Sequence, residues 1–120
     1  MRRDPVTERI IECAYKVSNA LGCGFLEKVY ENALAYELRH AGFAVKQQEP
    51  ILIRYEGVVV GEYFADLLVD EIILLELKAV KDFDDIHMAQ CLNYLKATRL
   101  SICLLMNFGK PKVDIKRIAN

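Results

Sequence analysis

The stretch "IILLELKAV", Ile72 to Val80, decides how the whole sequence is interpreted. Apolar residues lead into Glu76 and Lys78, and two further apolar residues follow them. Alternate side chains of a β-strand share a face, so both charged residues lie with Leu74 on one face, while the opposite face is entirely apolar. Taking an unpaired charge out of water costs on the order of several kcal/mol. The two charges therefore face either water or a chemical site.

Length and composition limit what the chain can be. Its 120 residues fit a single domain, residues 1–120, with one site. Hydrophobic residues make up 53% of the chain, a high share for a small monomer, so we expect a homodimer that covers part of the apolar surface. The net charge of -1 is unlike that of a protein that coats nucleic acid by bulk electrostatics, so any such contact needs a local patch.

Location follows from what the sequence lacks. No apolar run approaches the ~20 residues of a membrane span, and the start "MRRDPVTERI" has no apolar core of a signal peptide. We therefore expect a cytoplasmic protein with no membrane contact. The four cysteines include no C-x-x-C pair, which favours reduced thiols over a zinc site or disulfides.

Hydrophobic periodicity predicts the element order α-α-β-β-β-α-β-β. Asp4 and Pro5 open the first helix, and Gly22 and Gly42 are the expected stops of the first two helices. The predicted helices are 5–21, 26–42 and 82–98, and the predicted strands are 45–56, 58–69 with an interruption at Gly61, 72–80, 100–108 and 112–118. This order is typical of an α/β (α+β) layer fold with helices on a mixed sheet.

Asp66 is the charge that interrupts the preceding strand. Residues opposite each other in an antiparallel pair have a constant sum of positions. Asp66 and Glu76 can therefore share a face only if the connection holds an odd number of residues or a bulge is present. A two-residue turn at Asp70 and Glu71 would place them on opposite faces.

Two carboxylates and a lysine at a strand end can form a site for a hard divalent cation. Mg²⁺ prefers one or two carboxylates and completes its shell with water and substrate phosphate. The lysine would then neutralise phosphate charge or help to activate the attacking water. A solvated cross-strand ion pair is the alternative, and spacing alone favours it because a Glu-x-Lys pair is common on strands.

The joint order of several motifs resembles the PD-(D/E)XK nuclease superfamily. The motifs are "ADLLVDEIILLELKAV" with Asp66, Glu76 and Lys78, followed by "QCLNY" with Gln90 and Tyr94. More narrowly, "GFLEKVY" from Gly24 is similar to the signature of the GxxExxY family of small prokaryotic proteins within that superfamily. The resemblance continues through "LLMNFG" to "KRI" and covers nearly the whole chain. Ala65 replaces the proline of the superfamily's name, a position that varies within it.

The resemblance implies a restriction-endonuclease-like core and a role for each motif residue. Asp66 and Glu76 would be the ligands of Mg²⁺ or Mn²⁺, Glu27 an additional acidic residue near the metal, and Lys78 the catalytic lysine. Gln90 and Tyr94 would support the site or contact substrate. No organic cofactor is implied.

Each supporting residue also has a simpler interpretation. Glu27 suits the first turn of a helix through the dipole alone, and Gln90 and Tyr94 could be core-facing residues with satisfied polar ends. His87 is expected at the helix rim and Tyr30 in the packing. The basic segment 110–117 is expected to be a solvated strand, with a phosphate patch as the alternative.

The sequence therefore favours a Mg²⁺- or Mn²⁺-dependent nuclease acting on nucleic acid, with DNA as the expected substrate. The main alternative is a non-catalytic module of the same fold that binds protein or nucleic acid. A third is a protein whose active partner is another chain. The complete set of acidic residues and lysine favours the enzyme, because a binding-only module has little physical reason to keep it.

Overall fold

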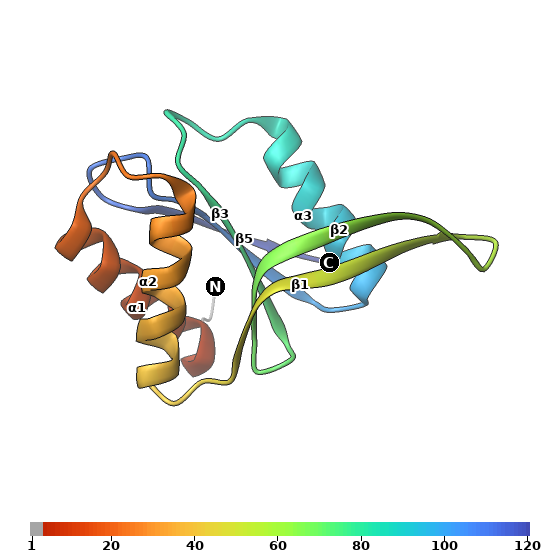
Figure 1. Ribbon diagram of the computed structural model, residues 1–120, viewed down its shortest axis with the longest axis horizontal. Coiled ribbons are helices and arrows are strands. Elements are labelled where there is room, and N and C mark those ends of the chain that lie inside the picture. The colour runs from red at the N-terminus through yellow and green to blue at the C-terminus, as the bar shows by residue number, and fades with distance from the viewer. Residues whose placement is uncertain (1–3) are drawn as a thin grey trace.

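The computed structural model describes residues 4–120 as three layers, with a mixed β-sheet between helices on both faces (Figure 1). The elements are α1 Pro5–Leu21, α2 Glu27–His40, β1 Val45–Tyr55, β2 Val58–Val69, β3 Ile73–Lys78, α3 Asp85–Thr98, β4 Ile102–Asn107 and β5 Asp114–Ala119. The predicted fold class and element order are confirmed. Residues 1–3 of the start "MRRDPVTERI" lie outside the described residues.

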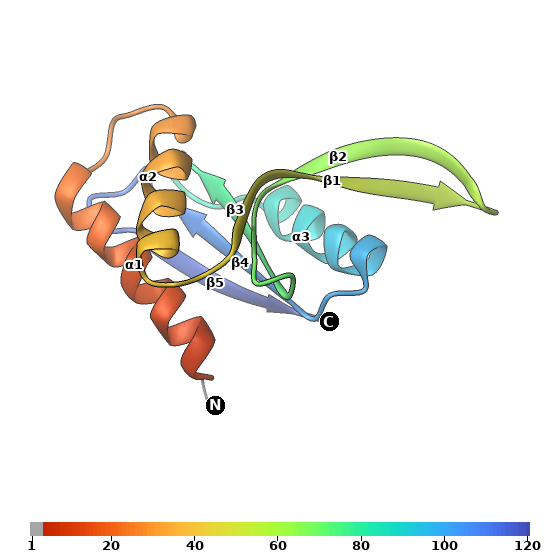
Figure 2. The same cartoon turned by 60° about the horizontal axis from the view of Figure 1, so that its bottom comes forward.

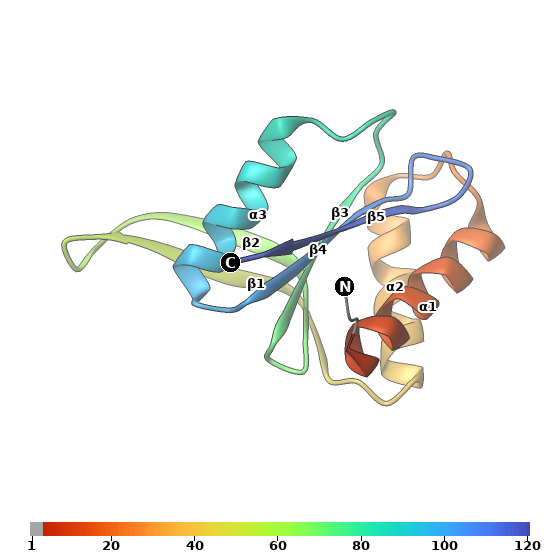
Figure 3. The same ribbon diagram turned by 180° about the vertical axis from the view of Figure 1, so that it is seen from behind.

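The sheet has the order β1-β2-β3-β4-β5. Only β3 and β4 run parallel within the described chain, and α3 connects them as a crossover. The other neighbours are antiparallel. Figure 3 shows α3 on the face of the sheet opposite α1 and α2.

Helix ends follow the expected chemistry. The Asp4 side chain caps α1 by accepting from the Thr7 amide, and Gly22 ends the helix. The third helix begins later than predicted, because Asp84 is its N-cap. His87 returns the capping contact, since its Nδ1 accepts from the Asp84 amide.

Two strand predictions need correction. The strand predicted at 72–80 ends at Lys78, and the strand predicted to break at Gly61 runs through that residue. The irregularity lies beside Gly61, where the pairing register shifts between Ile53 and Arg54. A bulge on the long hairpin therefore supplies the distortion that the glycine suggested.

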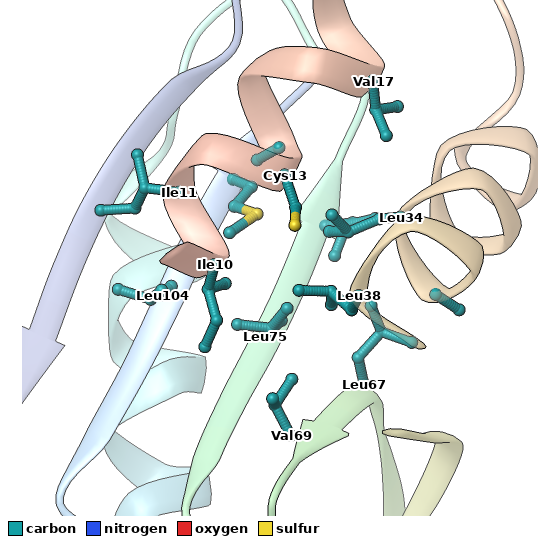
Figure 4. Packing of buried hydrophobic residues seen from close by; sticks show 14 of the residues in the cluster. Ile10, Ile11, Cys13, Val17, Leu34, Leu38, Leu67, Val69, Leu75 and Leu104 are labelled. Carbon is teal, nitrogen blue, oxygen red and sulfur yellow. The ribbon is translucent and has the colours of Figure 1, made fainter. Parts of the chain in front are cut away.

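The larger core lies between the sheet and the helices α1 and α2. Leu67, Leu75 and Leu104 on the strands pack with Ile10 and Leu38 on the helices, and all five are fully buried (Figure 4). The second cluster lies under α3, around Leu74, Cys91 and Leu95. β3 thus turns a wholly apolar face toward α1 and α2, as its alternation predicted.

The outer halves of β1 and β2 project beyond the body of the molecule as a two-stranded arm (Figure 2). Apolar side chains are exposed near its tip, namely Tyr55, Val58, Val59 and Val60. None of the helices in residues 4–120 is long and apolar enough to cross a membrane.

Candidate functional site

Asp66 and Glu76 lie side by side where β2 and β3 separate. The ladder between these strands ends at the pair Leu67 and Leu75. One step further on, Glu76 Oε1 accepts the Asp66 amide at 3.0 Å, and Asp66 Oδ2 accepts the Leu77 amide at 2.7 Å. Each carboxylate thus takes the place of a main-chain acceptor at the end of the ladder. Charge-assisted bonds of this kind fix both side chains in position.

The connection between the two strands explains why the carboxylates share a face. It holds three residues, 70–72, and both Asp70 and Glu71 adopt positive φ angles, 52° and 62°. An odd-numbered connection was the condition derived from the sequence, and the structure meets it. The two-residue turn considered as the alternative does not occur.

Crowding of the two acids changes their titration. Burial raises the pKa of Glu76 to about 9, and the neighbouring charge of Asp66 adds to the effect. Burial also raises the pKa of Asp66. The pair therefore favours having a proton or a cation between its members at neutral pH.

Lys78 extends this pair along the same face of β3. Its Nζ lies 3.4 Å from Gln90 Oε1, and Gln90 Nε2 donates to the Tyr94 hydroxyl at 2.9 Å. Within residues 4–120, no carboxylate oxygen lies within 4 Å of the Lys78 ammonium. The direct Glu76–Lys78 ion pair considered from the sequence is therefore not formed. Gln90 and Tyr94 instead link Lys78 to α3.

Glu27 approaches from α2, of which it is the first residue. Burial of its carboxylate raises its pKa, while the charge of Lys78 and the amide of Ala79 lower it and the charge of Asp66 raises it. These influences place Glu27 at the same site as the strand residues.

Tyr30 holds the loop that leads to Glu27. Its ring is fully buried and stacks on Phe108 at 4.9 Å, as expected for a packing residue. Its hydroxyl also donates to the Gly22 carbonyl at 2.7 Å and accepts the Phe25 amide at 3.2 Å. The Glu-x-x-Tyr spacing thus couples an acidic residue at the site to the tyrosine that fixes its loop.

Asn107 holds the segment that follows Lys78, and sequence reasoning missed it. Its buried side chain accepts the Val80 amide at 3.1 Å and donates to the Val80 carbonyl at 2.9 Å. Gly109 is required beside it, because a Cβ there would lie 2.3 Å from the Val80 carbonyl oxygen. Phe108 completes the contact by donating its amide to the Lys78 carbonyl. The motif "MNFG" therefore fixes where β3 ends.

A second missed group connects α2 to Asp66. Glu31 is 4% exposed and accepts from Gln47, Gln48 and Lys28. Gln48 Nε2 also lies 3.3 Å from Asp66 Oδ1. The register of the β1–β2 pair on either side of Gln48 places this residue opposite Asp66. Gln48 adopts φ 54° there, an uncommon value for a non-glycine residue inside a strand. The sequence signal was the one-turn spacing of Glu27 and Glu31 on α2.

Hydrogen bonds hold five of the predicted residues near one another at the end of β3, and the sixth, Glu27, lies within electrostatic reach of Lys78 and Asp66; the five are Asp66, Glu76, Lys78, Gln90 and Tyr94. His87 belongs to the helix cap, in agreement with the expected rim position. In the described chain, no group of three or more His, Cys, Asp and Glu side chains is assembled as a ready metal site. The predicted ligand role of Glu27 therefore has no direct geometric support.

Residues 4–118 match the family model of the PD-(D/E)XK nuclease superfamily. The chain belongs to the PD-(D/E)XK nuclease superfamily. Searches among curated proteins and among solved structures returned no significant match. The membership supports a nuclease-like function for the chain.

Nucleases of the PD-(D/E)XK superfamily generally use divalent metals, and the donor set here fits such an ion. Glu76 Oε2 has no hydrogen-bond partner within residues 4–120. Asp66 Oδ1 has only the long contact to Gln48. Two carboxylates with available oxygens suit Mg²⁺, which keeps several waters in its shell.

Proposed function

We propose that this protein is a Mg²⁺- or Mn²⁺-dependent nuclease that hydrolyses phosphodiester bonds in DNA. The observation that carries the proposal is a pair of hydrogen bonds to backbone amides: Glu76 Oε1 accepts the Asp66 amide and Asp66 Oδ2 accepts the Leu77 amide, so two crowded carboxylates are held beside Lys78. The proposal includes membership of the narrower GxxExxY family and one nuclease-like domain over residues 1–120.

Asp66 and Glu76 would hold the ion, with Glu27 supporting its water shell. A bound divalent ion supplies positive charge to a phosphoryl oxygen and lowers the pKa of a coordinated water. Lys78 orients the attacking water or stabilises negative charge that develops on the phosphoryl group. The water oxygen bonds to phosphorus, one P–O ester bond breaks, and the leaving oxygen takes up a proton.

Gln90 and Tyr94 position Lys78 in this scheme. The amide oxygen of Gln90 faces the ammonium, and the Tyr94 hydroxyl fixes the orientation of that amide. Glutamine cannot neutralise the lysine, so the full positive charge stays available for phosphate. A carboxylate at position 90 would instead hold the ammonium away from substrate.

A non-catalytic binding module is the second candidate. It is favoured by the lack, within residues 4–120, of an assembled three-residue metal site. Titration calorimetry with Mn²⁺, combined with cleavage assays on linear and circular DNA and on RNA, separates the two candidates. Cleavage that requires the metal and disappears in Asp66→Asn supports the nuclease. Nucleic-acid binding with no metal uptake and no cleavage by wild type supports the module.

We also propose that the protein forms a homodimer through the tip of the arm. A two-stranded hairpin that projects into solvent is marginally stable alone, and this one exposes Tyr55 and Val58 to Val60. Pairing of two arms would cover these side chains and bring two sites to one nucleic acid. Sedimentation at micromolar concentration tests this, and a monomer mass contradicts it.

A further inference from the structure

An open cleft lies between the base of the β1–β2 arm and α3. It has a volume of about 720 Å³ and is walled by Leu52 to Arg54 and Tyr63 on the arm side. Figure 2 shows α3 running beneath the arm along this direction. A cleft of this volume can hold a few nucleotides of a single strand, and ligand pockets in proteins span about 300–1,000 Å³.

The helix side of the cleft is one face of α3. Ile86, Gln90, Asn93 and Ala97 recur at helical spacing and all line the cleft. This face does not pack on the sheet, because Cys91, Tyr94 and Leu95 are the buried residues of α3. A face that mixes apolar and amide side chains, with Ile86 68% exposed, is therefore left open to a ligand.

The charge around the cleft is of one sign. Arg54, Lys96 and Arg99 line it, and no aspartate or glutamate among residues 4–120 does. None of the three cations is paired with a carboxylate within the described chain. Because the whole chain has a net charge of -1, this is a local concentration of positive charge. It matches a phosphate backbone.

Arg99 stands at a position where a different residue is usual. It follows α3 as the C-cap with φ 62°, a left-handed conformation that glycine or asparagine adopts at lower cost. The arginine at this position lines the cleft together with Arg54 and Lys96.

Tyr63 adds an aromatic wall. It is 51% exposed, and its ring lies 5.8 Å from that of Tyr94. Exposed aromatic faces beside a cationic groove are the platform on which proteins stack bases of single strands.

The cleft is continuous with the candidate site. Gln90 and Tyr94 line it and also form the hydrogen-bond chain to Lys78. By contrast, three of the four cations in the basic segment 110–117 are engaged elsewhere: Lys110 is paired to Asp82, Lys112 lies over the ring of Tyr15, and Arg117 lies 3.9 Å from Asp4. The cleft is therefore the better phosphate-binding surface.

We infer that this cleft binds single-stranded nucleic acid and guides it to Lys78. Arg54, Lys96 and Arg99 contact phosphates, and a base stacks on Tyr63. The inference rests on the proposed function only for what happens to the strand after it is bound. It narrows the substrate class to single strands, including frayed ends and displaced strands.

Fluorescence anisotropy in EDTA tests binding without cleavage. The probes are labelled ten-nucleotide oligo(dT) and oligo(rU) and a blunt ten-base-pair duplex. The variant Arg54→Gln/Lys96→Gln/Arg99→Gln is compared with Lys16→Gln/Lys46→Gln/Lys112→Gln, which has the same net charge and no change in the cleft. Thermal melting confirms that both variants are folded.

The cleft variant should weaken oligo(dT) binding at least tenfold and the control less than twofold. The slope of log K against log salt should decrease by about 2, since each phosphate contact contributes about 0.7 for single strands. Tyr63→Ala should weaken binding about tenfold, and Tyr63→Leu, which keeps the packing volume, should do the same. Wild type should bind the single strand more tightly than the duplex.

An equal loss of oligo(dT) affinity in the two triple variants would overturn the inference. Equal affinity of wild type for the duplex and the single strand would also overturn it. A cleft variant that turns a dimer into a monomer without changing oligo(dT) binding would also overturn it, because a second copy would then fill the cleft. Cleavage with Mg²⁺ that is unaffected by the cleft variant overturns the inference and leaves the proposed function standing. Binding of oligo(dT) that depends on the cleft, without any cleavage, supports the inference and contradicts the proposed function.

Discussion

The two faces of the sheet are built from the same strands and carry opposite chemistry. On β3, Ile73, Leu75 and Leu77 point toward α1 and α2, whereas Leu74 and Glu76 point toward α3. The first face joins a large cluster of apolar side chains. The second includes a carboxylate that is 3% exposed. Neighbouring residues of one strand therefore belong to the apolar core on one face and to the candidate site on the other.

The difference shows which face of the sheet tolerates crowded charge. The first face provides most of the buried apolar contacts, so the second can hold groups that do not favour folding. Asp66 and Glu76 still have hydrogen-bond partners, because the ladder ends where they begin. Each prediction below tests this division between a stabilising face and a face with a binding or catalytic role.

Lys78→Met should give the largest effect, on cleavage. We expect cleavage to fall about 10³-fold, since a positioned proton-transfer or charge-stabilising group contributes about 10²–10⁴-fold. The free energy of unfolding should change by less than about 1 kcal/mol, because the lysine has a neutral partner, Gln90. Gel-based cleavage and urea titration measure the two quantities. Lys81→Met, an exposed lysine three residues on, is the control.

A loss of about 3–5 kcal/mol of stability with cleavage unchanged would show instead that Lys78 is part of a buried ion pair. The Lys81→Met variant controls for the general effect of removing one positive charge from this segment.

Leu75→Ala and Leu74→Ala compare the faces directly, because the two leucines are adjacent and almost fully buried. Both should lower the free energy of unfolding by about 3 kcal/mol through lost burial and a residual cavity. Only Leu74→Ala should also reduce cleavage per folded molecule, since Leu74 shares its cluster with Tyr94. Equal loss of cleavage in both variants would contradict the division of roles.

The stability of the metal-free protein should decrease with rising pH. Glu76 has a folded pKa of about 9, above its ordinary value of 4.5, so the folded state retains a proton that the unfolded state releases. The stability from the neutral carboxyl is fully present below about pH 4.5 and is lost as the pH rises toward 9. We expect a loss of about 4 kcal/mol between pH 6 and 9, seen as a melting temperature lower by about 10–20 °C.

Glu76→Gln should flatten this dependence, because the amide does not titrate. Mn²⁺ at pH 8 should raise the melting temperature of wild type and leave Glu76→Gln nearly unchanged, since only the native pair binds it. A wild-type curve with no slope between pH 6 and 9 would contradict the crowding of the two acids.

The sequence predicted the fold and the strand chemistry because both depend on local periodicity. Alternation in β3 gave the apolar face, and the constant position sum related Asp66 to Glu76 before the structure showed the three-residue connection. The role of Asn107 could not be predicted, because it depends on a hydrogen bond to Val80, which is 27 residues away in the sequence. Gly109 likewise is explained only by the backbone that approaches it.

Gln48 gives the smallest expected effect and tests how precisely the site is held. Gln48→Gly and Gln48→Ala both remove the amide that bridges Glu31 and Asp66. They differ in backbone cost, because glycine adopts φ 54° freely and alanine does not. The glycine variant should therefore be more stable than the alanine variant by about 1 kcal/mol in urea titrations. Both should bind Mn²⁺ more weakly than wild type, since Asp66 loses a positioning contact. Equal stability of the two variants would mean that the strand relaxes at this point, and that the bridge follows from the fold without strain.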